Sequence, residues 1–389
     1  MAALLALTTG AQAQPESMAS IFSNANNGDR PMVIPRRSSV IIIACHGLGF
    51  GDLSCYGQTN FQTPNIDRLA AEGTRFTDYR VTSDDLPTAE AVLMAGNSKG
   101  TGATQHSLAA RMLDAGYHTK LVGEWTLGTP WTQGFEEFGG YLSEAEAKNY
   151  YSDYVYRYVP QAIYDPTNHT QGTFNDREEI YDNTGNKKGK FVPDQLMTAV
   201  ANFARVCRPS FANHYQPFFF LVELPAPETV TPGKDDYPVP TDAPYSGESW
   251  PQAAKNRAAL MTRLDNNVGH LLEQLSKLGM TNNVAIFLTG SVAPEKFANT
   301  NLNFLTLKGE VRGGKSADRF KVPMIVRWPE HVPAGKVSRA PWSIVDLAPT
   351  VMEIGYARTD ANITGISVLP ILMGEPGTNT LTVPDRIQR

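Results

Sequence analysis

Side chains able to bind a metal ion stand at the end of an apolar run near the start of the chain. Cys45 and His46 follow the run SVIIIA and precede the glycine-rich turn GLGFG. Cysteine and histidine suit soft ions such as zinc, whereas calcium prefers carboxylate oxygens. The two residues could bind zinc together with Asp85, Glu124 or Glu228. No CxxC or HxxxH spacing accompanies them, and we favour a partly buried thiol and a hydrogen-bonded imidazole.

A second reactive group lies in the segment DDLPTAEAVLMAG, residues 84–96. The hydroxyl of Thr88 could act as a nucleophile if a metal ion or a base activated it. The sequence offers no evident activating group beside it. The alternative is that Thr88 is an ordinary residue at the N-terminus of a helix.

Alternating strand and helix patterns predict the elements that must position these groups. A helix from about 252 to 278 is the clearest element, because its apolar residues recur at steps of three and four. The order of the elements predicts an α/β fold, a mostly parallel central sheet with helices on both faces. The predicted strands are 39–45, 74–81, 118–125, 217–224, 283–290 and 322–329.

The carboxyl ends of several predicted strands are the expected place for a ligand. In sheets of this kind, ligands bind in a crevice beyond the carboxyl ends of the strands. We therefore expect Cys45, Glu124, Leu224 and Gly290 to converge on one crevice.

Composition limits the partners and the compartment. The net charge is −5 and the isoelectric point about 5.8, without a basic stripe, so we expect no nucleic-acid partner. No apolar run is long enough for a transmembrane helix, and the three cysteines make no disulfide framework. The start MAALLALTTGAQAQPE resembles a signal peptide, which predicts an extracytoplasmic protein, periplasmic or secreted.

Longer motifs carry a resemblance to a known family. GFGDLSCYGQTNFQTPNIDRLAAEGTRFTDYRV resembles the N-terminal region of the sulfatases, in the alkaline phosphatase superfamily. LDAGYHTKLVGEWTLG, MTRLDNNVGHLLEQLSKLGM and DLAPTVMEIG continue the likeness in family order. The resemblance implies a sulfatase-like α/β domain over 38–375 without the family's usual small C-terminal domain. We expect an insertion over 141–190, a signal-like segment and linker over 1–37, and a C-terminal tail over 376–389.

For a working member, the resemblance implies a calcium site made by an Asp-Asp pair and an Asp-Asn pair. Here the matching positions hold Cys45 and His46, then Gly290 and Ser291. Glycine offers no side-chain oxygen and serine only a neutral one, so nothing at these positions compensates a divalent charge. We therefore expect no metal and no other cofactor, although the family binds calcium.

The resemblance also implies a C/S-x-P-x-R motif whose Cys or Ser becomes formylglycine, the nucleophile. The nucleophile position here is Asp85 or Leu86, and the arginine position is Ala89 or Glu90, depending on the register. Like charges ~4 Å apart repel by roughly 4 kcal/mol at an effective dielectric of about 20, so an acidic pocket should reject a sulfate ester. The vestigial pocket positions are Asp85, Glu90, Glu124, Thr126, Glu228 and Lys315, of which Lys315 alone matches the family.

These losses predict a catalytically inactive, sulfatase-like pseudoenzyme that serves as a structural subunit bound to other protein subunits. The tyrosine-rich segment 141–159 is a candidate protein-contact surface; a lid-like loop is the alternative. Two other functions stay open. The first is an active sulfuric or phosphoric ester hydrolase with a rearranged site, and the second is a non-catalytic module that binds a sugar or a cation.

Overall fold

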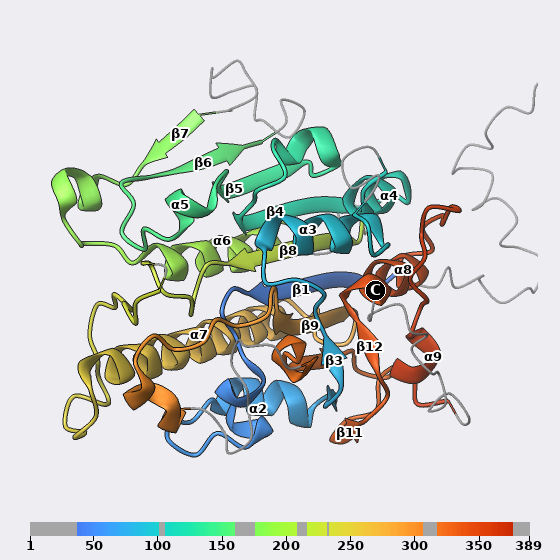
Figure 1. Cartoon of the computed structure of the whole chain (residues 1–389). Coiled ribbons are helices and arrows are strands. Elements are labelled where there is room, and N and C mark those ends of the chain that lie inside the picture. The colour runs from blue at the N-terminus through green and yellow to red at the C-terminus, as the bar shows by residue number, and fades with distance from the viewer. Residues whose placement is uncertain are drawn as a thin grey trace, which may run out of the picture. The chain divides into compact units, whose positions relative to one another are not determined.

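The computed structural model describes residues 37–100, 106–159, 176–207, 216–231, 233–305 and 317–375 (Figure 1). The signal-like segment up to residue 36 and the predicted tail 376–389 lie outside these residues. No helix in these ranges is long and apolar enough to cross a membrane.

A ten-stranded sheet forms the centre of the described structure. Its middle strands β9, β1, β8, β4 and β5 are all parallel, and antiparallel pairs lie toward both edges. The prediction of a mostly parallel α/β fold is therefore confirmed. Across the sheet the strands are β11 (Lys336–Ser338), β2 (Thr74–Phe76), β10 (Met324–Arg327), β9 (Val284–Gly290), β1 (Ser39–Cys45), β8 (Phe218–Leu224), β4 (His118–Glu124), β5 (Glu137–Tyr141), β6 (Tyr154–Tyr158) and β7 (Asp176–Glu179).

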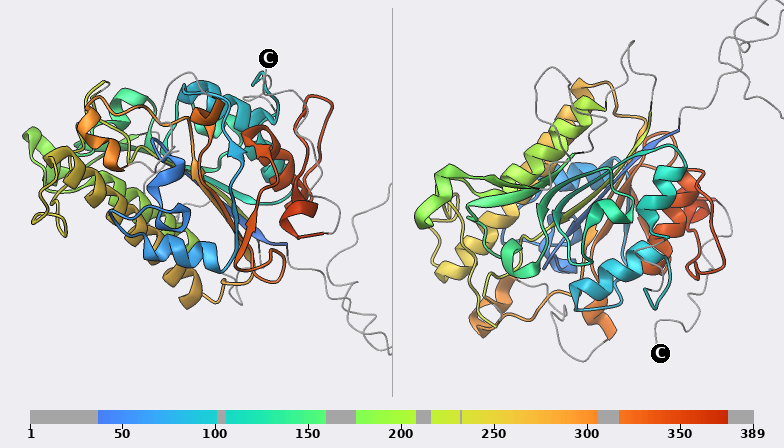
Figure 2. Two further views of the ribbon diagram at one scale, coloured as in Figure 1. Left: turned by 60° about the horizontal axis from the view of Figure 1, so that its bottom comes forward. Right: turned by 90° about the horizontal axis from the view of Figure 1, so that it is seen from above.

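Helices cover both faces of the sheet (Figure 2). Because side chains alternate along a strand, Ile41 and Ile43 of β1 pack into one core, whereas Val40 and Ile42 pack into the other. This two-sided burial explains the continuous apolar run of β1. The first core includes side chains of α2 (Pro64–Ala71), α6 (Val192–Val206) and α7 (Gln252–Lys277), and the second includes those of α3 (Leu86–Ala95), α4 (Leu108–Asp114) and α8 (Ile344–Ile354).

Two expectations about local structure need revision. The predicted strand 74–81 is divided between β2 and the short β3 (Tyr79–Arg80), which pairs with β12 (Trp342–Ser343) in a separate small sheet. The segment 141–159 is not a plain loop, because it contributes α5 (Glu144–Ala147) and β6 and extends the central sheet. Its Tyr150 is buried, and the hydroxyl donates to the carbonyl oxygens of Pro225 and Glu228 at 2.9 and 2.6 Å.

Arg257 of α7 connects the loops that follow β1 and β8. Its side chain is 1% exposed and donates to the carbonyl oxygen of Pro227 at 2.7 Å and to that of Gly47 at 3.3 Å. It also pairs with the buried carboxylate of Asp52 at 2.7 Å. One buried guanidinium therefore fixes two chain segments that meet at the same end of the sheet.

Replacing this arginine should destabilise the fold much more than replacing a neighbouring arginine of the same helix. Arg257→Met leaves Asp52 buried without its arginine, and we expect a loss of about 3–5 kcal/mol in the free energy of unfolding. Arg263→Met removes a partly exposed ion pair with Asp194, and we expect a loss of about 1 kcal/mol or less. Urea denaturation measures both; equal losses would contradict the anchoring role of Arg257.

Candidate functional site

Four neighbouring parallel strands end together at the carboxyl end of the sheet. Cys45 at the end of β1 pairs in register with Leu224 of β8 and Gly290 of β9, and Gly123 of β4 pairs with Glu223 of β8. The predicted convergence of these strand ends is therefore observed. The side chains at these strand ends form three polar pairs.

The first pair joins His46 and Glu124, whose side chains are 8% and 1% exposed. The Nδ1 atom of His46 lies 3.6 Å from Oε2 of Glu124, which is too long for a hydrogen bond. Nδ1 and both carboxylate oxygens have no hydrogen-bond partner. Burial alone would lower the pKa of His46, but the carboxylates of Glu124 and Glu228 outweigh it and raise this pKa to about 9.

The second pair joins Glu90 of α3 to Thr126. The backbone N–H of Thr126 donates to Oε2 of Glu90 at 3.0 Å, and the threonine hydroxyl donates to the same oxygen. Burial, and then the charge of Glu223, raise the pKa of Glu90 well above its ordinary value. The environment therefore favours the neutral carboxylic acid.

The third pair joins Glu223, near the end of β8, to Ser291, which follows β9. The hydroxyl of Ser291 donates to Oε2 of Glu223 at 2.6 Å, and both residues are 3% exposed. Burial raises the pKa of Glu223 to about 8, against the opposing effect of the Ser291 hydrogen bond. Glu223 is therefore mostly protonated at neutral pH.

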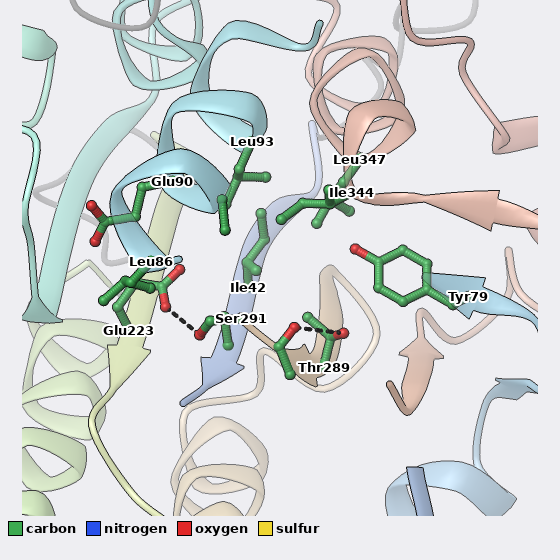
Figure 3. Close-up of a pocket in the computed structure, with 13 residues that line it drawn as sticks. Ile42, Tyr79, Leu86, Glu90, Leu93, Glu223, Thr289, Ser291, Ile344 and Leu347 are labelled. Carbon is green, nitrogen blue, oxygen red and sulfur yellow. Dashed lines mark hydrogen bonds between the residues drawn. The ribbon is translucent and has the colours of Figure 1, made fainter. Parts of the chain in front are cut away.

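A small cavity lies beside the second and third pairs (Figure 3). Its polar lining comes from Glu90, Glu223, Ser291, Thr289 and Tyr79, and apolar side chains of α3 and α8 complete it. The space of about 10 Å³ has room for about one water molecule. Oε1 of Glu90 and the hydroxyl of Tyr79 are buried without a hydrogen-bond partner, so a water held here would meet polar atoms.

The two candidate nucleophile positions contribute no reactive group to this cavity. Asp85 is exposed and is the N-cap of α3, where it accepts hydrogen bonds from the backbone N–H and hydroxyl of Thr88 at 3.0 and 2.6 Å. This is ordinary helix capping. Leu86 lines the cavity as an apolar side chain. Lys315 lies outside the described residues.

The residues at the family's metal positions do not fit calcium. Cys45 is fully buried in the apolar core, and burial raises the pKa of its thiol. Gly290 has no side chain, and the hydroxyl of Ser291 is bonded to Glu223. The described residues hold no group of three or more His, Cys, Asp or Glu side chains placed to bind a metal. Neither calcium nor the zinc alternative fits this donor set, and the expectation of no cofactor stays a prediction.

Glu223 is a site residue that the sequence analysis missed. It is the only charged residue in the apolar run FFFLVEL of β8. A lone carboxylate near the end of a strand buried on both faces is the signal that could have identified it.

Burial also revises the electrostatic argument made from the sequence. From the sequence alone, every carboxyl group of the pocket counts as ionised. In the folded chain the environment favours neutral Glu90 and Glu223, and His46 is a cation at neutral pH. The crevice is therefore less negative than a count of its acidic residues suggests.

Stability should fall as pH rises because of Glu223. Its pKa is about 8 in the folded chain against an ordinary value of 4.5. Its contribution is therefore fully present below about pH 4.5 and is lost as pH rises through about 8, with up to about 1.4 kcal/mol per pH unit. We expect Glu223→Gln to reduce this slope in urea denaturation between about pH 5 and 8. A variant with the wild-type slope would contradict the assignment.

Comparison with curated proteins identifies carbohydrate sulfatases as relatives. N-acetylgalactosamine-6-sulfatase of Canis lupus familiaris is 26% identical over 382 residues, which cover 87% of this chain and 67% of that protein. N-acetylgalactosamine-6-O-sulfatase of Bacteroides thetaiotaomicron is 25% identical over 88% of this chain and 75% of that protein. The chain spans about two thirds of the length of its mammalian relatives, 67% and 66% for the dog and rat proteins.

Solved structures show the same fold. Ps i-CgsB in complex with k-i-k-neocarrahexaose superposes with a TM-score of 0.67 at 24% identity, covering 87% of this chain and 76% of that chain. BT4656 in complex with its substrate D-glucosamine-2-N,6-O-disulfate gives a TM-score of 0.63 at 19% identity, covering 87% and 81%.

These comparisons correct the prediction that the protein is not an enzyme. The curated relatives are named sulfatases, and the solved neighbour BT4656 is described with a sulfated substrate. The prediction of a pseudoenzyme was wrong because it equated the loss of the family's usual site residues with the loss of a site. The folded chain instead has buried, mutually paired polar groups at the carboxyl ends of its central strands.

The family model described as Sulfatase matches residues 38–355, which is most of the chain. The match begins with β1 and ends just after α8, so it includes every strand end that forms the crevice. This chain belongs to the sulfatase family.

Proposed function

We propose that this protein hydrolyses sulfate monoesters of carbohydrates with a rearranged site. Membership of the sulfatase family and the names of the curated relatives support the reaction class. The observation that carries the proposal is the buried Ser291–Glu223 hydrogen bond of 2.6 Å at the converging strand ends. It holds a carboxyl group with a pKa of about 8 at the carboxyl ends of parallel strands, where sheets of this kind generally bind ligands.

Glu223 is suited to act as a general acid. Hydrolysis breaks the bond between sulfur and the sugar oxygen, and that oxygen needs a proton as it leaves. A carboxylic acid that is still protonated near neutral pH can supply it, and buried glutamates do this in other hydrolases. Water adds to sulfur, and Glu223 passes its proton to the sugar oxygen through one water, for which the cavity beside it has room. The proton released by the attacking water restores Glu223.

The neighbouring groups lower the repulsion that a sulfate would meet. Glu90 is held by two hydrogen bonds from Thr126 in an environment that favours its neutral form. His46 is a cation that offsets the negative charge of Glu124, 3.6 Å away. With these groups neutral or paired, a singly charged sulfate ester no longer faces four ionised carboxylates.

The proposed general acid has a distinctive kinetic signature. We expect Glu223→Gln to reduce kcat/KM for N-acetylgalactosamine 6-sulfate by about 10²–10⁴-fold. The loss should be much smaller for p-nitrophenyl sulfate, because a nitrophenolate leaves without help from an acid. The matched control Glu178→Gln changes an exposed glutamate of the edge strand β7 and should leave both rates unchanged.

Two outcomes would reject this function. The first is that the wild-type protein turns over neither ester. The second is that Glu223→Gln keeps wild-type kcat/KM for the sugar ester. In the wild type, activity should also fall as pH rises through about 8, where Glu223 loses its proton.

The proposed reaction uses no calcium, since the residues at the family's metal positions do not fit that ion. We expect kcat/KM for N-acetylgalactosamine 6-sulfate to be the same after dialysis against EDTA and after calcium is restored. Loss of activity on chelation with recovery on adding calcium would contradict the proposed donor set.

Location and protein partners remain proposals that accompany this function. The signal-like start of the sequence supports export from the cytoplasm. Tyr154, Tyr156 and Tyr158 of β6 are only partly buried, which supports a protein-contact surface near the edge strand β7.

A further inference from the structure

The His46–Glu124 pair leaves more hydrogen-bonding capacity unused than a structural ion pair would. Glu124 is 1% exposed, yet neither of its carboxylate oxygens accepts a hydrogen bond, and Nδ1 of His46 has no partner either. A buried donor or acceptor without a hydrogen bond is costly because nothing compensates its lost contact with water, and native proteins rarely leave one unsatisfied. These three atoms belong to two side chains that face each other across 3.6 Å.

The types of the unused atoms define the ligand that would satisfy them. The two oxygens of Glu124 require donors. Nδ1 of His46 faces a carboxylate and so carries a hydrogen, which requires an acceptor. A hydroxyl group both donates and accepts, so one hydroxyl can donate to Glu124 and accept from His46. A second, adjacent hydroxyl can donate to the other oxygen of Glu124.

Other ligands satisfy these atoms less well. A metal ion or an ammonium group offers no acceptor and would leave the N–H of His46 unpaired. A sulfate offers only acceptors and would meet the two oxygens of Glu124. A diol supplies both kinds of group without adding charge.

Two further charged side chains, Glu228 and Lys148, lie near the pair. Glu228 lies against Gly47, since a Cβ atom at Gly47 would stand 2.3 Å from Oε2 of Glu228. Lys148 interacts electrostatically with both His46 and Glu228 and is only partly buried. Its ion pair with Glu144, at 2.6 Å, is of the i,i+4 type that contributes little to stability, so its side chain can move at low cost.

We propose that His46 and Glu124 bind two adjacent hydroxyl groups of a carbohydrate. The site rests on the proposed function only in that the sugar would be the part of the substrate that carries the sulfate. The family resemblance implies a metal-binding Asp at the position of His46, and Glu124 is one of the pocket positions that do not match the family. With His46 and Glu124 at these two positions, the pair is suited to bind neutral hydroxyl groups.

Binding of unsulfated sugars tests this site without any turnover. Isothermal titration of the full chain with galactose and N-acetylgalactosamine should give saturable binding. We expect Glu124→Gln, which keeps the size of the side chain, to weaken it by about 10- to 100-fold, since a hydrogen bond to a charged group is lost. The control Glu178→Gln should bind as the wild type does, and circular dichroism checks that each variant is folded.

A second measurement asks which sugar hydroxyl Glu124 contacts. Singly deoxygenated analogues of galactose are titrated into the wild type and into Glu124→Gln. At least one analogue should bind the wild type more weakly than galactose does, and the same deletion should cost little in the variant. This coupling is expected only if Glu124 contacts that hydroxyl.

Calcium chloride, zinc chloride and methylammonium chloride are titrated as well. Failure of the wild type to bind either sugar would overturn the proposal, as would saturable binding of a cation that Glu124→Gln abolishes. The outcomes separate the two proposals. Sugar binding without hydrolysis would reject only the proposed function, and hydrolysis of p-nitrophenyl sulfate without sugar binding would reject only this site.

Discussion

Burial of carboxyl groups at the carboxyl ends of the parallel strands is the constraint on which this structure depends. Glu90, Glu124, Glu223 and Glu228 are each at most 5% exposed, and they gather where β1, β4, β8 and β9 end. Four ionised carboxylates could not share such a place at acceptable cost. The fold resolves the conflict by neutral forms, by hydroxyl donors and by one histidine cation.

The same constraint gives the site its chemistry. A pKa near 8 makes Glu223 a proton donor at neutral pH, whereas a solvated glutamate would be an anion there. Glu124 lies beside His46 without hydrogen-bond partners, and this unused capacity is what the proposed sugar site would occupy. Arg257 keeps the arrangement in place, because it binds the loops that carry His46 and Glu228 through Gly47 and Pro227.

Several described residues at the positions where this chain departs from the family are far apart in the sequence, but they contact one another or a neighbouring strand end in the folded chain. Glu90 meets Thr126, His46 faces Glu124, and Ser291 meets Glu223. These contacts form a defined polar site. Such a site agrees with the naming of the curated relatives as sulfatases.

The sequence by itself determined the α/β class, the family and the strand ends that form the crevice, because apolar periodicity and local motifs encode these features. It also marked His46, Glu90, Glu124 and Ser291 as positions of interest. It could not pair them, since pairing depends on contacts between residues 36 to 78 positions apart. Only the tertiary structure decided their protonation, because desolvation and neighbouring charge set a pKa. For that reason the sequence suggested a repulsive acidic pocket, whereas the folded chain has a paired and partly neutral one.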